Sequence, residues 1–136
     1  MTELTLENPG SVPAPFAARF SHVARINLGT GALLLLSGQV AVDDDGSVLA
    51  PGDVRAQTQH IYELIRALLD AYGATFADVA HVRTFLTNMD DLGAYAEVRR
   101  EYFDDPRPAS TTVEVSRLFA AGVVVEVEVT AFVAAP

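Results

Sequence analysis

The last third of the chain alternates between apolar and polar residues with the period of a β-strand. Every second residue from 123 to 129 is valine, and Glu126 and Glu128 stand between these valines. The valines therefore share one face of a predicted strand over residues 122–132, and the two glutamates share the other face, with Cα atoms roughly 6–7 Å apart. The glutamate face is either a solvated surface or the wall of a polar cleft, and the alternation leaves both open.

A second alternating segment, residues 107–118, comes just before the first one. Within it, Ser110, Thr112 and Glu114 fall on one face of the predicted strand, and the residues between them fall on the other. The same two interpretations, a solvated surface or a cleft wall, apply to this face of hydroxyl and carboxylate groups.

Three further strands and two helices are predicted earlier in the chain. The predicted strands cover residues 20–28, 32–42 and 78–87, and the predicted helices cover residues 53–72 and 88–103. Asp53 is a favourable N-cap for the first helix, and Gly73 is a favourable stop. Residues 1–15 contain three prolines and predict an extended arm rather than a helix.

This order of elements predicts an α+β fold in which two helices pack on one face of a mixed sheet. The four leucines at 33–36 lack alternation and predict a strand that is buried on both faces. The sheet face away from the helices is too apolar to remain in water, so the pattern predicts an oligomer that closes over it. With no repeat or low-complexity segment, residues 1–136 are predicted to form a single domain.

Composition narrows the possible classes of function. The formal net charge is −9 and the chain has no lysine, which disfavours contact with nucleic acid. The absence of cysteine excludes thiol catalysis and thiolate metal sites, and the three histidines lack metal-ligand spacing, so no metal is expected. The first residues lack a signal-peptide pattern and no apolar run could span a bilayer, so we expect a cytoplasmic protein without membrane contact.

Two local patterns are candidates for a functional site. The segment Ser37-Gly38-Gln39 interrupts the predicted strand 32–42, and its glycine marks either a bulge or a place where a ligand approaches the backbone. Glu126 is either a glutamate on a solvated strand face or an acid/base group in a cleft.

Four segments together resemble one known family. They are Leu36-Ser-Gly-Gln-Val40, Asn88-Met-Asp-Asp-Leu92, Arg107-Pro-Ala-Ser-Thr-Thr-Val-Glu-Val115 and Val125-Glu-Val-Glu-Val129. Their order and spacing are similar to those of the Rid family of reactive intermediate deaminases, also called YjgF or L-PSP endoribonucleases. The resemblance implies a chorismate-mutase-like fold and a homotrimer whose sheets form a central barrel. It also implies sites between subunits that hydrolyse 2-aminoacrylate-type enamines and imines to 2-oxo acids and ammonia, without a metal or organic cofactor.

Carried over residue by residue, the resemblance implies that Glu126 is the water-activating glutamate. It also implies that Ser37, Gly38 and Gln39 are retained site residues whose backbone orients the substrate. An apolar wall of the site is expected from Phe16 and Phe20, of which Phe20 stands near the position of a family tyrosine and lacks its hydroxyl.

Besides Phe20, three positions depart from the family pattern. The arginine that grips the substrate carboxylate in the deaminases is Ser110 here, a cysteine is Thr112, and an asparagine of the second helix is Ala96. The hydroxyls of Ser110 and Thr112 are expected to orient the substrate instead. Loss of a buried charge-assisted pair costs about 2–5 kcal/mol, so a simple 2-imino acid should bind tens- to thousands-fold more weakly. Four other cations are candidates to enter the cleft: Arg25, Arg83, Arg107 and Arg117.

The sequence is therefore compatible with three functions. The first is a Rid-family enzyme that hydrolyses or tautomerises an enamine or imine larger than 2-aminoacrylate. The second is a trimeric module that binds a small molecule, or acts like a chaperone, without catalysis. The third, a ribonuclease, follows from the older family name and is disfavoured by the charge of −9.

Overall fold

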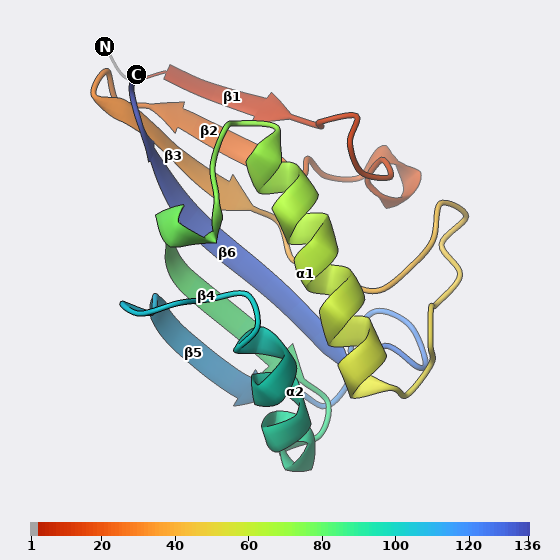
Figure 1. The fold of residues 1–136 in the computed structure, drawn as a ribbon. Coiled ribbons are helices and arrows are strands. Elements are labelled where there is room, and N and C mark those ends of the chain that lie inside the picture. Colours follow the sequence, from red (N-terminus) through yellow and green to blue (C-terminus); the bar gives the residue numbers. More distant parts are fainter. Residues whose placement is uncertain (1–2) are drawn as a thin grey trace.

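The computed structural model describes residues 3–136 as one mixed six-stranded sheet with two α-helices in front of it (Figure 1). The strands are β1 (Glu3–Glu7), β2 (Val23–Asn27), β3 (Gly31–Leu36), β4 (Val79–Leu86), β5 (Ala109–Glu114) and β6 (Val125–Ala134), and the helices are α1 (Val54–Asp70) and α2 (Leu92–Arg99). The strand order is β1-β2-β3-β6-β4-β5. Only the β4–β5 pairing is parallel among these neighbours. The predicted α+β fold, with both helices on one face of a mixed sheet, is confirmed.

Helix α1 begins and ends where the sequence predicts. The carboxylate of Asp53 accepts a hydrogen bond from the Ala56 backbone N–H, and Gly73 takes the left-handed conformation just beyond the helix end. Gln57 is fully buried although it is polar, and it donates to the carbonyls of Leu49, Ala50 and Gly122. Its carbonyl oxygen accepts from the Val124 N–H at 3.0 Å. One side chain thereby fixes the start of β6, two residues before Glu126.

Helix α2 is shorter than predicted. A 3-10 turn, Met89–Asp91, precedes it and is capped by Asn88, and the helix ends at Arg99 instead of near residue 103. Tyr95 is the buried residue of α2 and anchors the helix through its hydroxyl, which bonds to the hydroxyls of Tyr62 and Thr84. The other apolar side chains of α2 do not form a continuous buried stripe, because Val98 is half-buried and Leu92 at the helix start is 38% exposed.

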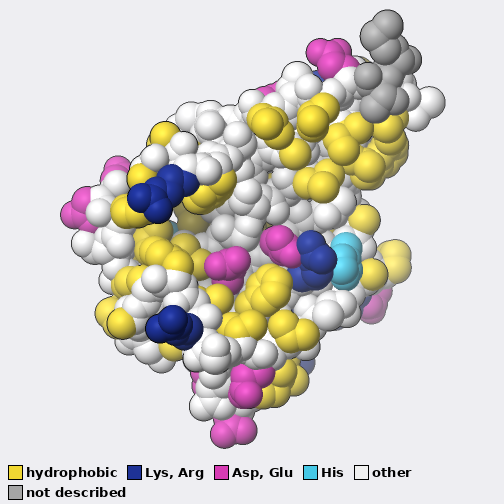
Figure 2. All heavy atoms as spheres, turned by 180° about the vertical axis from the view of Figure 1, so that it is seen from behind, with side chains coloured by type: hydrophobic (Ala, Val, Ile, Leu, Met, Phe, Trp, Pro, Cys, Tyr) yellow, Lys and Arg dark blue, Asp and Glu magenta, His cyan; other side chains and the backbone are white. Residues whose placement is uncertain are grey.

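The leucine run in β3 alternates in burial, which corrects the prediction of a strand buried on both faces. Leu34 and Leu36 are buried beneath the helices, whereas Leu35 points to the other side and is 41% exposed. Both helices cover the same face, so the second face carries apolar side chains without cover from residues 3–136. We call this second face the open face (Figure 2). Its larger apolar side chains, assigned by strand register, are Leu4, Leu6, Ile26, Leu33, Leu35, Phe85, Val113 and Phe132.

The N-terminal segment is more ordered than the predicted arm. Glu3–Glu7 forms the edge strand β1, which pairs antiparallel with β2, and residues 1–2 of the predicted arm lie outside the described residues. The prolines that suggested an arm all follow this strand. Among residues 3–136, no helix has the length and apolar character needed to cross a membrane.

Candidate functional site

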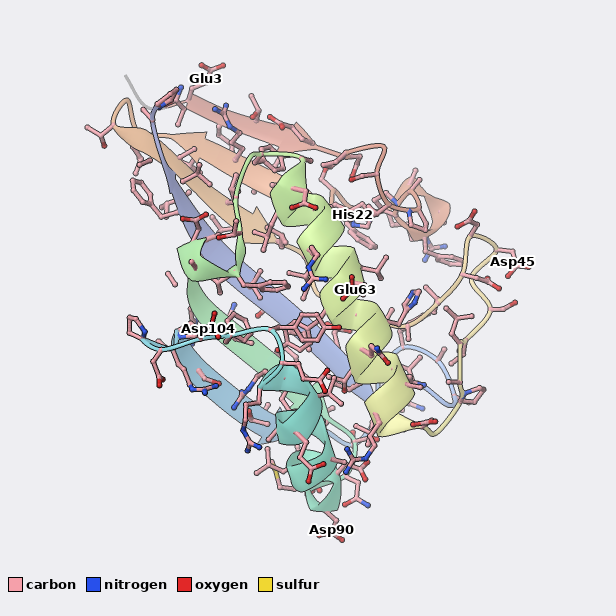
Figure 3. All side chains as sticks on the ribbon, in the orientation of Figure 1. Glu3, His22, Asp45, Glu63, Asp90 and Asp104 are labelled. Carbon is pink, nitrogen blue, oxygen red and sulfur yellow. The ribbon has the colours of Figure 1, made fainter. Side chains whose placement is uncertain are left out.

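A cavity of about 410 Å³ opens beside the end of β3 and the start of β6. Its walls come from the loop between β1 and β2, the segment after β3, the turn before α1, and Glu126 on β6. Asp45 lies at the tip of the loop between β3 and α1, next to this region (Figure 3). Six of the predicted site residues line the cavity: Phe16, Phe20, Ser37, Gly38, Gln39 and Glu126.

Glu126 is half-buried and belongs to the open face of the sheet. In the register of β6 with β4 it lies opposite Phe85, and Glu128 lies opposite Arg83, with which it forms an ion pair at 2.6 Å. Within residues 3–136 the carboxyl group of Glu126 makes no hydrogen bond or ion pair. Burial, and secondarily the negative charge of Glu128, raises the pKa of Glu126 above its usual value. A carboxyl group that lies in a cavity, is free of partners and has a raised pKa can give or take a proton.

Gly38 makes room for this carboxyl group. A Cβ atom at position 38 would lie 2.8 Å from Cδ of Glu126 and closer still to Oε2, which no side chain tolerates. The sequence left open whether the glycine marks a bulge or a place where a ligand approaches the backbone, and the strand register shows a bulge. Between the Leu35–Thr130 and Gln39–Val127 pairs, β3 advances four residues (35 to 39) while β6 advances three (130 to 127).

Replacing Gly38 by alanine is expected to displace the Glu126 carboxyl group and to lower turnover about 100-fold, because a misplaced acid/base group loses its alignment with the substrate. The backbone at Gly38 does not have a positive φ, so the change tests space and not backbone strain. Turnover measured beside Gly10→Ala is the comparison, since a Cβ at Gly10 meets no atom within 4 Å. Equal activity of both variants would show that the carboxyl position is unimportant.

The side chains on either side of Gly38 hold the cavity wall together. The Ser37 hydroxyl donates to the Ser21 carbonyl at 2.6 Å, and the Gln39 amide donates to the Ser37 carbonyl at 3.1 Å. Gln39 Nε2 also lies 3.3 Å from Nδ1 of His22, whose Nε2 lies 2.7 Å from the Pro13 carbonyl. These contacts tie the loop after β1 to the end of β3, so both polar side chains position the wall in which Gly38 sits.

The rest of the cavity wall is largely apolar. Phe16 and Phe20, which are 58% and 47% exposed, stand on the loop between β1 and β2, and Phe119 adds a third exposed ring. Arg19, which lies between these two phenylalanines in sequence, lines the same cavity. Sequence reasoning missed Arg19, although its place between two predicted wall residues was a usable signal.

Ser110 and Thr112, whose hydroxyls are expected to orient the substrate, do not line this cavity within one chain. The parallel register of β5 with β4 pairs Ser110 with Val82 and Thr112 with Thr84, on the helix-covered face. Glu126 belongs to the open face, so the sheet separates it from both hydroxyls. Alternation along each strand was predicted correctly, but alternation alone does not say which faces of two strands coincide.

The four arginines considered from the sequence do not line the cavity, and two of them are held in ion pairs. Arg83 pairs with Glu128, and Arg107 pairs with Asp105 at 3.2 Å. In the described part of the chain no three His, Asp or Glu side chains gather as metal ligands would.

The family profile described as Endoribonuclease L-PSP matches residues 12–133. The chain belongs to the Rid family. Its relatives in this family include a RutC family protein of Pyrococcus horikoshii, 37% identical over 75% of this chain and 80% of that protein. Another is a 2-iminobutanoate/2-iminopropanoate deaminase of Dermatophagoides farinae, 33% identical over 65% of this chain and 69% of that protein.

Solved structures of Rid proteins have the same architecture. The Rid-family protein YyfA of Yersinia pestis superposes with a TM-score of 0.83 at 28% identity, over 96% of this chain and all of that one. RidA of a Psychrobacter species gives a TM-score of 0.80 at 27% identity, with the same coverage. The resemblance drawn from four short segments is therefore confirmed for both family and fold.

Proposed function

We propose that the protein is a homotrimeric deaminase of imines or enamines, with Glu126 as its acid/base residue. The observation that carries this proposal is the half-buried, unpartnered carboxyl group of Glu126, which lies against the backbone of Gly38 inside an apolar cavity. A solvated surface glutamate would need neither a raised pKa nor a glycine opposite its carboxyl group. A relative named as a 2-iminobutanoate/2-iminopropanoate deaminase supports the reaction class.

Glu126 would serve both proton transfers of imine hydrolysis. When the imine nitrogen is protonated, the carboxylate takes a proton from water while the water oxygen bonds to the imine carbon, and the C=N double bond becomes the C–N single bond of a carbinolamine. As a carboxylic acid it then returns that proton to the amine nitrogen. The C–N bond breaks, and the hydroxyl proton leaves with ammonia as ammonium while the carbonyl forms. With an enamine, the protonated group first gives its proton to the enamine carbon, which produces the protonated imine. The raised pKa makes the carboxylate a stronger base than an ordinary glutamate and keeps the acid form to higher pH.

The trimer would complete this site. The open face offers a large apolar area that a second and third copy would cover, and β5 lies at the edge of the sheet. In such an assembly the hydroxyls of Ser110 and Thr112 would reach the cavity of a neighbouring copy, whereas within one chain the sheet keeps them from Glu126.

The substrate would be larger than 2-aminoacrylate. Ser110 offers a hydroxyl where the deaminases are expected to offer a guanidinium, so affinity must come largely from other contacts. The rings of Phe16, Phe20 and Phe119 supply apolar area for a longer side chain.

The proposal is tested with imines generated in situ from a set of amino acids by an amino acid oxidase. We expect the protein to accelerate release of ammonia and the 2-oxo acid beyond spontaneous hydrolysis, with higher kcat/KM for larger apolar side chains than for alanine. Saturable binding of the same compounds without any acceleration would instead favour a non-catalytic binding module.

A further inference from the structure

The side chain of Arg99 lies across the edge of the sheet at β5. Arg99 is the last residue of α2, and its Nη1 donates to the Ser110 Oγ at 3.0 Å. Its guanidinium carbon stands 5.4 Å from the centroid of the Tyr95 ring. Tyr95 is fully buried and its hydroxyl bonds to those of Tyr62 and Thr84, so the ring is a fixed platform for the guanidinium.

Arg99 has no acidic partner among residues 3–136. Of the two glutamates nearest in sequence, Glu97 is paired with Arg55 at 2.7 Å and Glu101 forms no ion pair among these residues, and the remaining ion pairs involve other arginines. Arg99 is half-buried, and its one side-chain hydrogen bond within the described residues is to the neutral Ser110 hydroxyl. Most of the guanidinium N–H groups are therefore available to an anion from outside the chain.

The Ser110 hydroxyl adds a hydrogen-bond donor beside the guanidinium of Arg99. Its hydroxyl oxygen accepts from Arg99, which leaves the hydroxyl proton free to be donated onward. β5 is an edge strand that pairs with β4 on one side, and its other side is unpaired within the described part of the chain. A carboxylate at this edge would receive a guanidinium fork and a hydroxyl donor together, which is the geometry that carboxylates prefer.

We propose that Arg99 is a specificity residue that binds the far carboxylate of an acidic imine substrate. The proposal rests on the proposed function, in which β5 of one copy borders the Glu126 cavity of the next. The hydrogen bond to Ser110 keeps the Arg99 guanidinium at the edge of β5. A substrate carboxylate bound by this guanidinium therefore lies at the rim of the site. The substrate class is then an imine or enamine with a second acidic group several bonds from the reacting carbon.

The test compares two substrates that differ in charge and little in size. The imines formed from glutamate and from glutamine end in a carboxylate and in a carboxamide, respectively. In Arg99→Gln we expect KM for the glutamate-derived imine to rise about tenfold or more, with kcat and the glutamine-derived KM changed less than about threefold. Arg100→Gln, an exposed neighbour, is the matched control. Equal changes for both imines, or none, would overturn the assignment.

A binding measurement separates this inference from the proposed function. Titration with 2-oxoglutarate and 2-oxoglutaramate, followed by calorimetry, needs no turnover. We expect the wild-type protein to bind the dicarboxylate more tightly, and Arg99→Gln to remove that preference. If the preference survives in the variant, Arg99 is not the anchor, whether or not imines are hydrolysed. If wild-type protein binds both compounds equally, the inference also fails.

Discussion

Replacing Glu126 by glutamine is expected to lower kcat for imine hydrolysis by about 10²–10⁴-fold, with little change in KM. The amide has nearly the same size, so the cradle formed by Gly38 stays filled, but it can neither accept the proton of water nor return it to nitrogen. Initial rates of ammonia release, measured for both proteins on one imine, give the ratio directly.

The matched control is Glu128→Gln, on the same face of the same strand. Glu128 is paired with Arg83 and does not line the cavity, so its loss should leave kcat within about tenfold of wild type. Equal losses in the two variants would indicate that the negative charge of this face matters, and not proton transfer by one residue. An active Glu126→Gln variant would remove the proposed mechanism altogether.

Placing a charge on the open face is expected to dissociate the assembly and abolish turnover. Leu35→Glu puts a carboxylate amid the apolar side chains of β3 and β6, where assembly would bury it at a cost of several kcal/mol per copy. Wild-type protein should have about three times the mass of one chain in solution, and the variant should have the mass of one. Light scattering after gel filtration measures both, and circular dichroism checks that the variant remains folded.

Leu92→Glu provides the control for this prediction. Leu92 is similarly exposed, at 38% against 41% for Leu35, but it lies at the start of α2, away from the open face. Its substitution should change neither mass nor turnover. A Leu35→Glu protein that kept the wild-type mass would show that the open face is not the contact between copies, and full activity in a monomer would show that one chain is sufficient.

The elements of the fold could be predicted because each carries a local signal. The valine alternation of β6, and the Asp53 cap and Gly73 stop of α1, depend on residues close in sequence. Strand β1 escaped prediction because the prolines that follow it dominate the composition of the first 15 residues. The predicted helix extended beyond the observed end of α2. One buried tyrosine is enough to fix this helix, so no long apolar stripe in the sequence marks where it ends.

The candidate site was only partly predictable for a different reason. Glu126 and Gly38 could be proposed together from the family resemblance, but their contact depends on a bulge between β3 and β6 that alternation does not reveal. The separation of Ser110 from Glu126 depends on the parallel register of β4 and β5, which is a long-range property. The contact between Arg99 and Ser110 joins a helix to a strand across eleven residues and has no sequence pattern.

The pH dependence of kcat in the wild-type protein and in Glu128→Gln tests most directly whether Glu126 does the chemistry. Burial and the charge of Glu128 raise the pKa of Glu126, so the active carboxylate form accumulates only above the usual pH range of a glutamate. Removing the charge of Glu128 lowers that pKa, and the rising limb of kcat should therefore move to lower pH. If kcat rises over the same pH range in both proteins, the proton transfer belongs to another group. The same conclusion follows if the residual activity of Glu126→Gln rises over that pH range.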